Sequence, residues 1–125
     1  MRHDEFIAKV AQRADVSAGA AEALTAATLK TLAERISGGE AADLASQLPK
    51  ELQPHLIAAE ETAERFGVDE FIRRVADRAG TDPDSALKAQ GAVFATIREA
   101  VSPGELDDIA SQLPDDLRRL LGSNG

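Results

Sequence analysis

The stretch Ala-Ser-Gln-Leu-Pro at residues 45–49 recurs, letter for letter, at residues 110–114. When the chain is shifted by 65 positions, residues 4–56 align with residues 69–121 without a gap, and 23 of the 53 pairs are identical. A period this long with only two copies indicates an internal duplication and not a solenoid of stacked repeats. We call residues 4–56 the N-terminal segment and residues 69–121 the C-terminal segment.

The spacing of apolar residues on both sides of the repeated stretch predicts helices. Apolar residues recur every three or four positions, and the alternating Val, Ile and Thr runs that are typical of strands are missing. We therefore expect an all-α fold, an internally duplicated helical bundle with two pseudo-symmetric halves of three to four helices each. A chain of 125 residues suggests one domain, residues 1–125, in which the two segments are joined by residues 57–68.

Capping residues predict where the first two helices of each segment begin. The first helix is expected over residues 4–14 with Asp4 as its N-cap, and Asp69 is expected to open its copy. The second helix, about 18 residues long by its apolar spacing, should begin after Ser17 in the N-terminal segment. In the C-terminal segment it should begin at an Asp-Pro pair, residues 82–83, which suits an N-cap followed by the first helical position.

Both segments carry a capping-box pattern, in which a serine is followed three residues later by a glutamate. The pairs are Ser37 with Glu40 and Ser102 with Glu105. In this motif the serine side chain accepts from the backbone N–H of the glutamate, and the glutamate side chain returns to the serine N–H. We expect a third helix over residues 40–48 and its copy, each ended by the proline of the repeated stretch.

The chain between the segments allows two interpretations. Past Pro54 the apolar residues keep helical spacing as far as Gly67, which is a favourable C-cap residue. This spacing predicts a helical connector over residues 54–66. A loop is the alternative, because Pro54 interrupts the pattern.

Composition excludes several classes of protein. Acidic residues outnumber basic ones by 22 to 14, so a polyanion would be repelled, and the chain has no Tyr or Trp on which bases could stack. The absence of cysteine excludes disulfides and thiolate metal sites. No apolar run is long enough to span a bilayer, and the N-terminal residues lack the apolar core of a signal peptide. We therefore expect a cytoplasmic protein with a protein partner or a homo-oligomer, and neither nucleic acid nor membrane.

The repeated polar positions of the opening stretch are the only speculative site residues: Ser46, Gln47, Ser111 and Gln112. A serine nucleophile needs an adjacent base, and neither of the two histidines, His3 and His55, belongs to the repeated pattern. We interpret the four side chains as partners for backbone groups that are left free at helix ends. Residues 36–40 resemble the signature loop of ABC-type ATPases, but the chain has no phosphate-binding loop, so capping is favoured there.

Carboxylates also recur in both segments, among them Glu40 with Glu105 and Asp43 with Asp108. Acid–base catalysis would need two of them to converge in a cleft with shifted pKa values. Most lie where the N-terminus of a helix favours acid, so we interpret them as structural. No histidine or cysteine has metal-ligand spacing. We therefore expect no catalytic residue, no metal ligand and no cofactor.

Two stretches carry a resemblance to a known family. Ser-Gly-Gly-Glu-Ala-Ala-Asp-Leu-Ala-Ser-Gln-Leu-Pro, residues 37–49, and Ala-Glu-Arg-Phe-Gly-Val-Asp-Glu-Phe-Ile-Arg-Arg-Val, residues 63–75, resemble the prokaryotic domain of unknown function 2267. The resemblance covers nearly the whole chain. It implies a small, soluble, all-helical protein of two related halves joined by a loop, and it brings no established activity, ligand or catalytic residue.

These observations favour a non-enzymatic helical protein-interaction module. The alternative is a small-ligand-binding protein or an enzyme with its site between the two halves, where a pseudo-symmetric interface offers a pocket. The alternative requires a polar-lined cavity at that place.

Overall fold

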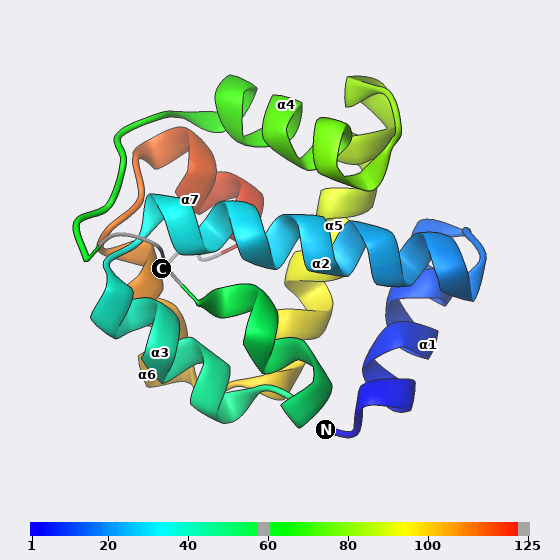
Figure 1. The fold of residues 1–125 in the computed structure, drawn as a ribbon, viewed down its shortest axis with the longest axis horizontal. Coiled ribbons are helices and arrows are strands. Elements are labelled where there is room, and N and C mark those ends of the chain that lie inside the picture. Colours follow the sequence, from blue (N-terminus) through cyan, green and yellow to red (C-terminus); the bar gives the residue numbers. More distant parts are fainter. Residues whose placement is uncertain (58–60, 123–125) are drawn as a thin grey trace.

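The computed structural model describes residues 1–57 and 61–122, and every regular element in those two ranges is a helix (Figure 1). The elements are α1 (His3–Ala14), α2 (Ala18–Arg35), α3 (Gly38–Gln47), the 3-10 helix η1 (Lys50–Leu56), α4 (Val68–Ala79), α5 (Pro83–Ala100), α6 (Pro103–Ala110) and α7 (Asp115–Leu121). The predicted all-α class is confirmed. None of the described helices is long and apolar enough to cross a membrane.

The helices of the two segments correspond closely in position. α1, α2 and η1 begin and end 65 residues before α4, α5 and α7, respectively. α3 and α6 also begin 65 residues apart, although α6 ends sooner. The two 18-residue helices, α2 and α5, have the predicted length.

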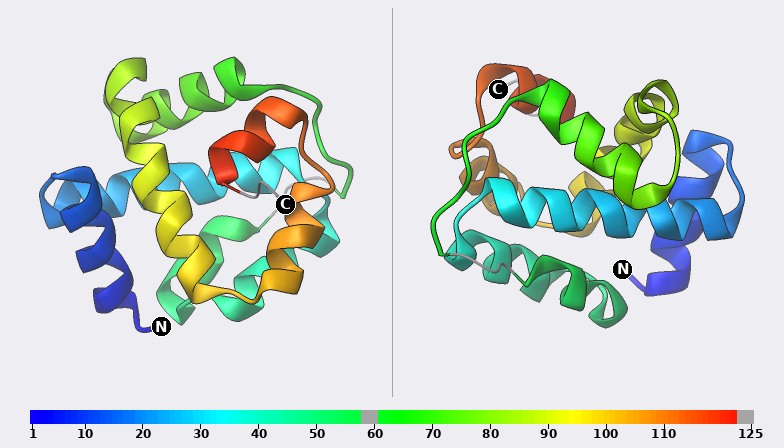
Figure 2. Two further views of the ribbon diagram at one scale, coloured as in Figure 1. Left: turned by 180° about the vertical axis from the view of Figure 1, so that it is seen from behind. Right: turned by 45° about the horizontal axis from the view of Figure 1, so that its top comes forward.

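The first helix of each segment packs on the second helix of its own segment and also on that of the other segment. α1 lies against α5, α4 lies against α2, and α2 and α5 cross near the centre of the molecule (Figures 1 and 2). α3 and α6 contact each other away from α1 and α4. One apolar core therefore draws residues from both segments, including the fully buried rings of Phe6, Phe71 and Phe94.

The same pair of polar contacts joins the first helix of each segment to the second helix of the other segment. Near the C-terminus of the first helix of each segment, an arginine donates to a buried threonine of the other segment. The same arginine forms an ion pair with a glutamate that lies three residues after that threonine. The residues are Arg13, Thr96 and Glu99 at one junction and Arg78, Thr31 and Glu34 at the other, with Nη1–Oγ1 distances of 3.0 and 2.8 Å. Both contacts join α1 or α4 to the opposite segment.

The helical connector predicted over residues 54–66 is wrong where the structure describes it. Pro54 lies inside η1, a 3-10 helix, and residues 61–67 form no helix. Residues 58–60 of the predicted connector lie outside the described residues. Gly67, expected as the connector's C-cap, is instead the N-cap of α4. This loop agrees with what the family resemblance implies.

Hydrogen bonds to other elements explain why this part of the chain is a loop. The backbone N–H of Glu64 donates to the carbonyl of Glu34, at 2.9 Å, and Arg35 Nε donates to the carbonyl of Phe66, at 2.7 Å. The Phe66 ring also lies under the guanidinium of Arg74, at 4.1 Å from its centroid. Because α2 and α4 satisfy these groups, the loop needs no helical hydrogen bonds of its own.

Two predicted N-caps are displaced. Asp4 and Asp69 lie within the first turns of α1 and α4, and the N-cap positions are Arg2 and Gly67. Acid in the first turn is still favoured by the helix dipole. The predicted cap of α5, Asp82, is confirmed, and Ser17, where the second helix was expected to start, is the N-cap of α2.

Candidate functional site

The repeated serines bond to their own helix, as the sequence suggested. Ser46 Oγ donates to the carbonyl of Asp43 and Ser111 Oγ donates to the carbonyl of Asp108, both at 2.6 Å. Both serines are exposed, and the only bond of each hydroxyl within the described residues is to backbone. Each hydroxyl therefore satisfies a backbone carbonyl near the C-terminus of a helix, and neither serine is an activated nucleophile.

The repeated glutamines have a different and longer-range partner. Gln47 Oε1 accepts from the backbone N–H of Ser102, and Gln112 Oε1 accepts from the backbone N–H of Ser37, both at 2.7 Å. We call these two contacts the serine–glutamine bridges. Each glutamine therefore satisfies a backbone N–H at the N-terminus of a helix in the opposite segment. The sequence had predicted bonds to backbone groups at the C-terminus of the glutamine's own helix.

The capping boxes are therefore only half formed. Ser37 Oγ accepts from the N–H of Glu40 and Ser102 Oγ accepts from the N–H of Glu105, both at 3.2 Å, as predicted. The predicted return of each glutamate to the serine N–H is wrong, because a glutamine occupies that N–H. The Oε2 atoms of Glu40 and Glu105 are buried and have no hydrogen-bond partner among the described residues. An unpaired buried polar group costs about 1–3 kcal/mol, and more when it is charged.

Four carboxylates meet where α3 contacts α6, and we call Glu40, Asp43, Glu105 and Asp108 the acidic cluster. One oxygen from each of the first three lies within 4.8 Å of the others. Glu105 is only 6% exposed. Its burial, together with the charges of Glu40, Asp43 and Asp108, raises its pKa to about 7. Burial, with Asp108 and Asp43, also raises the pKa of Glu40.

The sequence pattern favours a structural role for these carboxylates and does not predict that they converge. A signal was present, because both copies place a glutamate and an aspartate three residues apart, on one face of a helix. That the two faces would meet depends on how the segments pack, which the spacing within each segment does not reveal.

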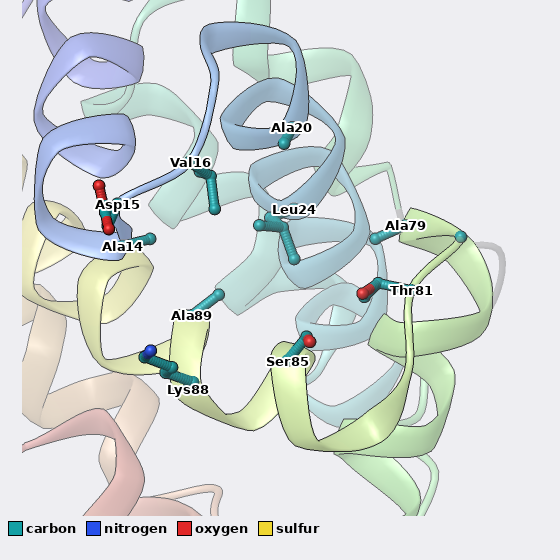
Figure 3. A pocket seen from close by; sticks show the side chains of 11 residues that line it. Ala14, Asp15, Val16, Ala20, Leu24, Ala79, Thr81, Ser85, Lys88 and Ala89 are labelled. Carbon is teal, nitrogen blue, oxygen red and sulfur yellow. The ribbon is translucent and has the colours of Figure 1, made fainter.

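A cavity of about 420 Å³ lies between the α1–α2 turn and the α4–α5 turn (Figure 3). It therefore lies between the two segments, where the ligand-binding alternative required one. Five pairs of its lining residues stand 65 positions apart: Ala14 and Ala79, Asp15 and Gly80, Val16 and Thr81, Ala20 and Ser85, and Leu24 and Ala89.

The walls of this cavity are apolar in the middle and polar at two sides. The side chains of Val16, Leu24 and Ala89 point toward a common centre (Figure 3). The hydroxyl groups of Thr81 and Ser85 lie to one side of that centre. The charged side chains of Asp15 and Lys88 lie on the other side. The sequence analysis singled out none of these residues, since only one of the five pairs is identical.

The described structure is thus that of a small all-α protein with a pocket between its two segments. The family model described as "Uncharacterized conserved protein (DUF2267)" matches residues 3–120, and the chain belongs to that family. The predicted resemblance is confirmed. A comparison with curated proteins found no match. The family description names no activity.

Proposed function

We propose that the protein is a non-enzymatic helical protein that binds a small amphiphilic molecule in the cavity between its segments. The cavity's position carries this proposal: it draws equivalent residues from both segments, and its volume of about 420 Å³ suits a small ligand. Such pockets commonly form between the helices of a bundle. No serine of the repeated stretch has an adjacent base among the described residues, which supports binding over catalysis.

We further propose that the pocket arose by internal duplication within one domain, residues 1–125. The repeats would be residues 4–56 and 69–121, joined by residues 57–68. The helix bounds that recur 65 residues apart support this, as do the repeated arginine–threonine–glutamate contacts. In such a duplicated protein, a pocket between the copies has one wall from each copy. Sequence changes in one copy can then make the two walls differ.

The lining defines the class of ligand. Val16 and Leu24 provide an apolar surface, and the hydroxyls of Thr81 and Ser85 provide donors and acceptors beside it. A molecule with a short apolar body and one hydrogen-bonding end matches this arrangement. A polyanionic ligand does not, because the chain carries a net charge of −8.

Amide NMR spectra of the labelled protein, titrated with a homologous series of alkanols and alkanoates, test this proposal. We expect saturable shifts in the α1–α2 and α4–α5 turns. Ala20→Phe, which fills the pocket, should abolish them. Ala18→Phe is the matched control, because Ala18 is exposed on the same helical turn and does not line the pocket. Absence of saturable shifts for the whole series, or shifts that persist in Ala20→Phe, would contradict the proposal.

A protein-interaction module is the second candidate, and one observation favours it. A largely apolar groove of about 650 Å³ runs along α3 and η1, and Ile57 at its edge is 78% exposed. The occupant that we propose is a second copy of the chain, since a two-fold contact would cover both Ile57 side chains at once. Light scattering should then show a dimer that Ile57→Asp dissociates, whereas Leu87→Asp, an exposed leucine on α5, should not. A monomer at every concentration contradicts this candidate.

A further inference from the structure

The two glutamates of the acidic cluster lack the role that their sequence pattern predicts. In a complete capping box each would bond to a serine N–H. Here Gln47 and Gln112 hold those N–H groups. Glu40 and Glu105 are left side by side, and their buried Oε2 atoms have no hydrogen-bond partner in residues 1–57 and 61–122.

Glu105 provides the observation that distinguishes this cluster from a group of solvated surface acids. Glu105 is only 6% exposed, and its carboxylate, whose Oε2 atom is buried, points into a group of like charges. Carboxylates that are held together in this way repel one another unless one of them binds a proton or a cation lies between them. Among the described residues, no lysine or arginine forms an ion pair with any of the four.

We propose that the acidic cluster binds one hard divalent cation through Glu40, Asp43 and Glu105. All the donor atoms are carboxylate oxygens, which Ca²⁺, Mg²⁺ and Mn²⁺ prefer, and no imidazole or thiolate is present in the group to favour zinc or copper. The fourth carboxylate, Asp108, adds negative charge beside the three ligands.

The distances suit a single ion. Oxygens that share one ion at roughly 2.0–2.6 Å lie within about 5 Å of one another. The three carboxylate oxygens meet this condition, since they lie within 4.8 Å of one another. Water molecules would complete the coordination of an ion that is held by three carboxylates, as is usual for Mg²⁺.

The location gives the ion a structural consequence. Glu40 and Asp43 belong to α3, and Glu105 belongs to α6, so one ion ties the N-terminal segment to the C-terminal segment. The proposed ion site is close to the serine–glutamine bridges. Each bridge joins the N-terminus of α3 or α6 to a glutamine of the opposite segment. A cation that binds only the folded arrangement stabilises it by mass action.

Full-length protein that has been freed of metal with a chelator allows a direct test. Mn²⁺ is added in buffered salt, and the concentration of free Mn²⁺ is measured by electron paramagnetic resonance. Binding of Ca²⁺ and Mg²⁺ is measured by titration calorimetry. Glu105→Gln and Asp43→Asn each remove one ligand. Asp107→Asn is the control, since it removes the same charge from an exposed site on α6 outside the cluster. Asp43 is exposed, so its replacement tests the site even if Glu105→Gln folds poorly.

We expect one saturable Mn²⁺ site per chain in the unaltered protein and a rise in Tm when the ion is added. Affinity should fall at least tenfold in Glu105→Gln and in Asp43→Asn and change less than twofold in Asp107→Asn. Lack of saturable binding of all three ions by the unaltered protein overturns the proposal. An equal loss of affinity in Asp107→Asn also overturns the proposal, because it would indicate diffuse attraction of the ion to an acidic surface. Undiminished binding in both Glu105→Gln and Asp43→Asn overturns it as well.

Discussion

At the scale of single residues, the surroundings of Glu105 make its charge unfavourable in the folded protein. It is buried against Glu40, Asp43 and Asp108, and its pKa is raised from 4.5 to about 7. A carboxyl group with a raised pKa binds its proton more tightly in the folded state than in the unfolded state. The folded state therefore loses stability when this group ionises.

This linkage predicts how stability depends on pH in the absence of divalent cations. Between about pH 4.5 and pH 7 the unfolded state gives up the Glu105 proton first, so the contribution of this group to stability falls as pH rises and stays low above pH 7. Glu105→Gln removes the contribution. Denaturant unfolding across this range should therefore show the variant gaining stability relative to the unaltered protein as pH rises. A difference that is independent of pH would contradict the raised pKa.

The serine–glutamine bridges make a second prediction at this scale. Gln47→Ala and Gln112→Ala each leave a serine N–H without its acceptor, which should cost about 1 kcal/mol of unfolding free energy. Ser46→Ala and Ser111→Ala are neighbouring controls whose hydroxyls are exposed, and their cost should stay within about 0.5 kcal/mol. Urea melts of the four variants measure this. Equal losses at serines and glutamines would count against the bridges.

The limits of sequence reasoning are visible in these same residues. The Ser37 and Ser102 caps were predictable, because a cap bonds to an N–H only three residues away. The glutamine that displaces each glutamate comes from the other segment, 55 or 75 residues away, and local rules contain no information about it. The convergence of the acidic cluster was missed for the same reason.

At the scale of elements, the loop at residues 61–67 depends on one buried arginine. Arg35 is 7% exposed and donates to the carbonyl of Phe66 at 2.7 Å and to the carbonyl of Gln112 at 3.0 Å. It therefore holds both the loop and the end of the repeated stretch against α2. The apolar spacing predicted a helix there because it does not register hydrogen bonds to distant elements.

Arg35→Met should release this loop. The variant keeps an apolar stem but loses both hydrogen bonds, and we expect a loss of about 2 kcal/mol and faster cleavage by a glutamate-specific protease. Arg65→Met is the control, because Arg65 is exposed in the same loop. Urea melts and timed proteolysis measure the two effects. The same cleavage rate in both variants would show that Arg35 does not restrain the loop.

At the scale of the whole molecule, contacts between the segments leave each segment incomplete alone. α1 and α4 each pack on both α2 and α5, so each segment supplies only one of the two helices that cover its own first helix. The periodicity and caps predicted nearly all of these helices, yet the same apolar stripes would suit packing within one segment alone. Which helix covers which was therefore beyond the sequence pattern.

Fragments that end and begin between residues 60 and 64 should be poorly helical in isolation. Each lacks one of the two helices that its first helix packs on, and roughly 60–65 residues bury too little surface to compensate. Mixed in equal amounts, the two fragments should regain helical circular dichroism and one cooperative melt. Separate cooperative melting of each fragment alone would show that the segments are independent.

The packing of α1 also affects how the chain can fold during its synthesis. α1 packs on both α2 and α5, and α5, which begins at Pro83, is made well after α1 and α2. The stripe of Phe6, Ile7 and Val10 can therefore pack on α2 first, but it lacks the α5 side of its contact until that helix has been made. The core is completed only after α5 has left the ribosome, and until then the half-covered α1 stripe is a place where a chaperone can bind.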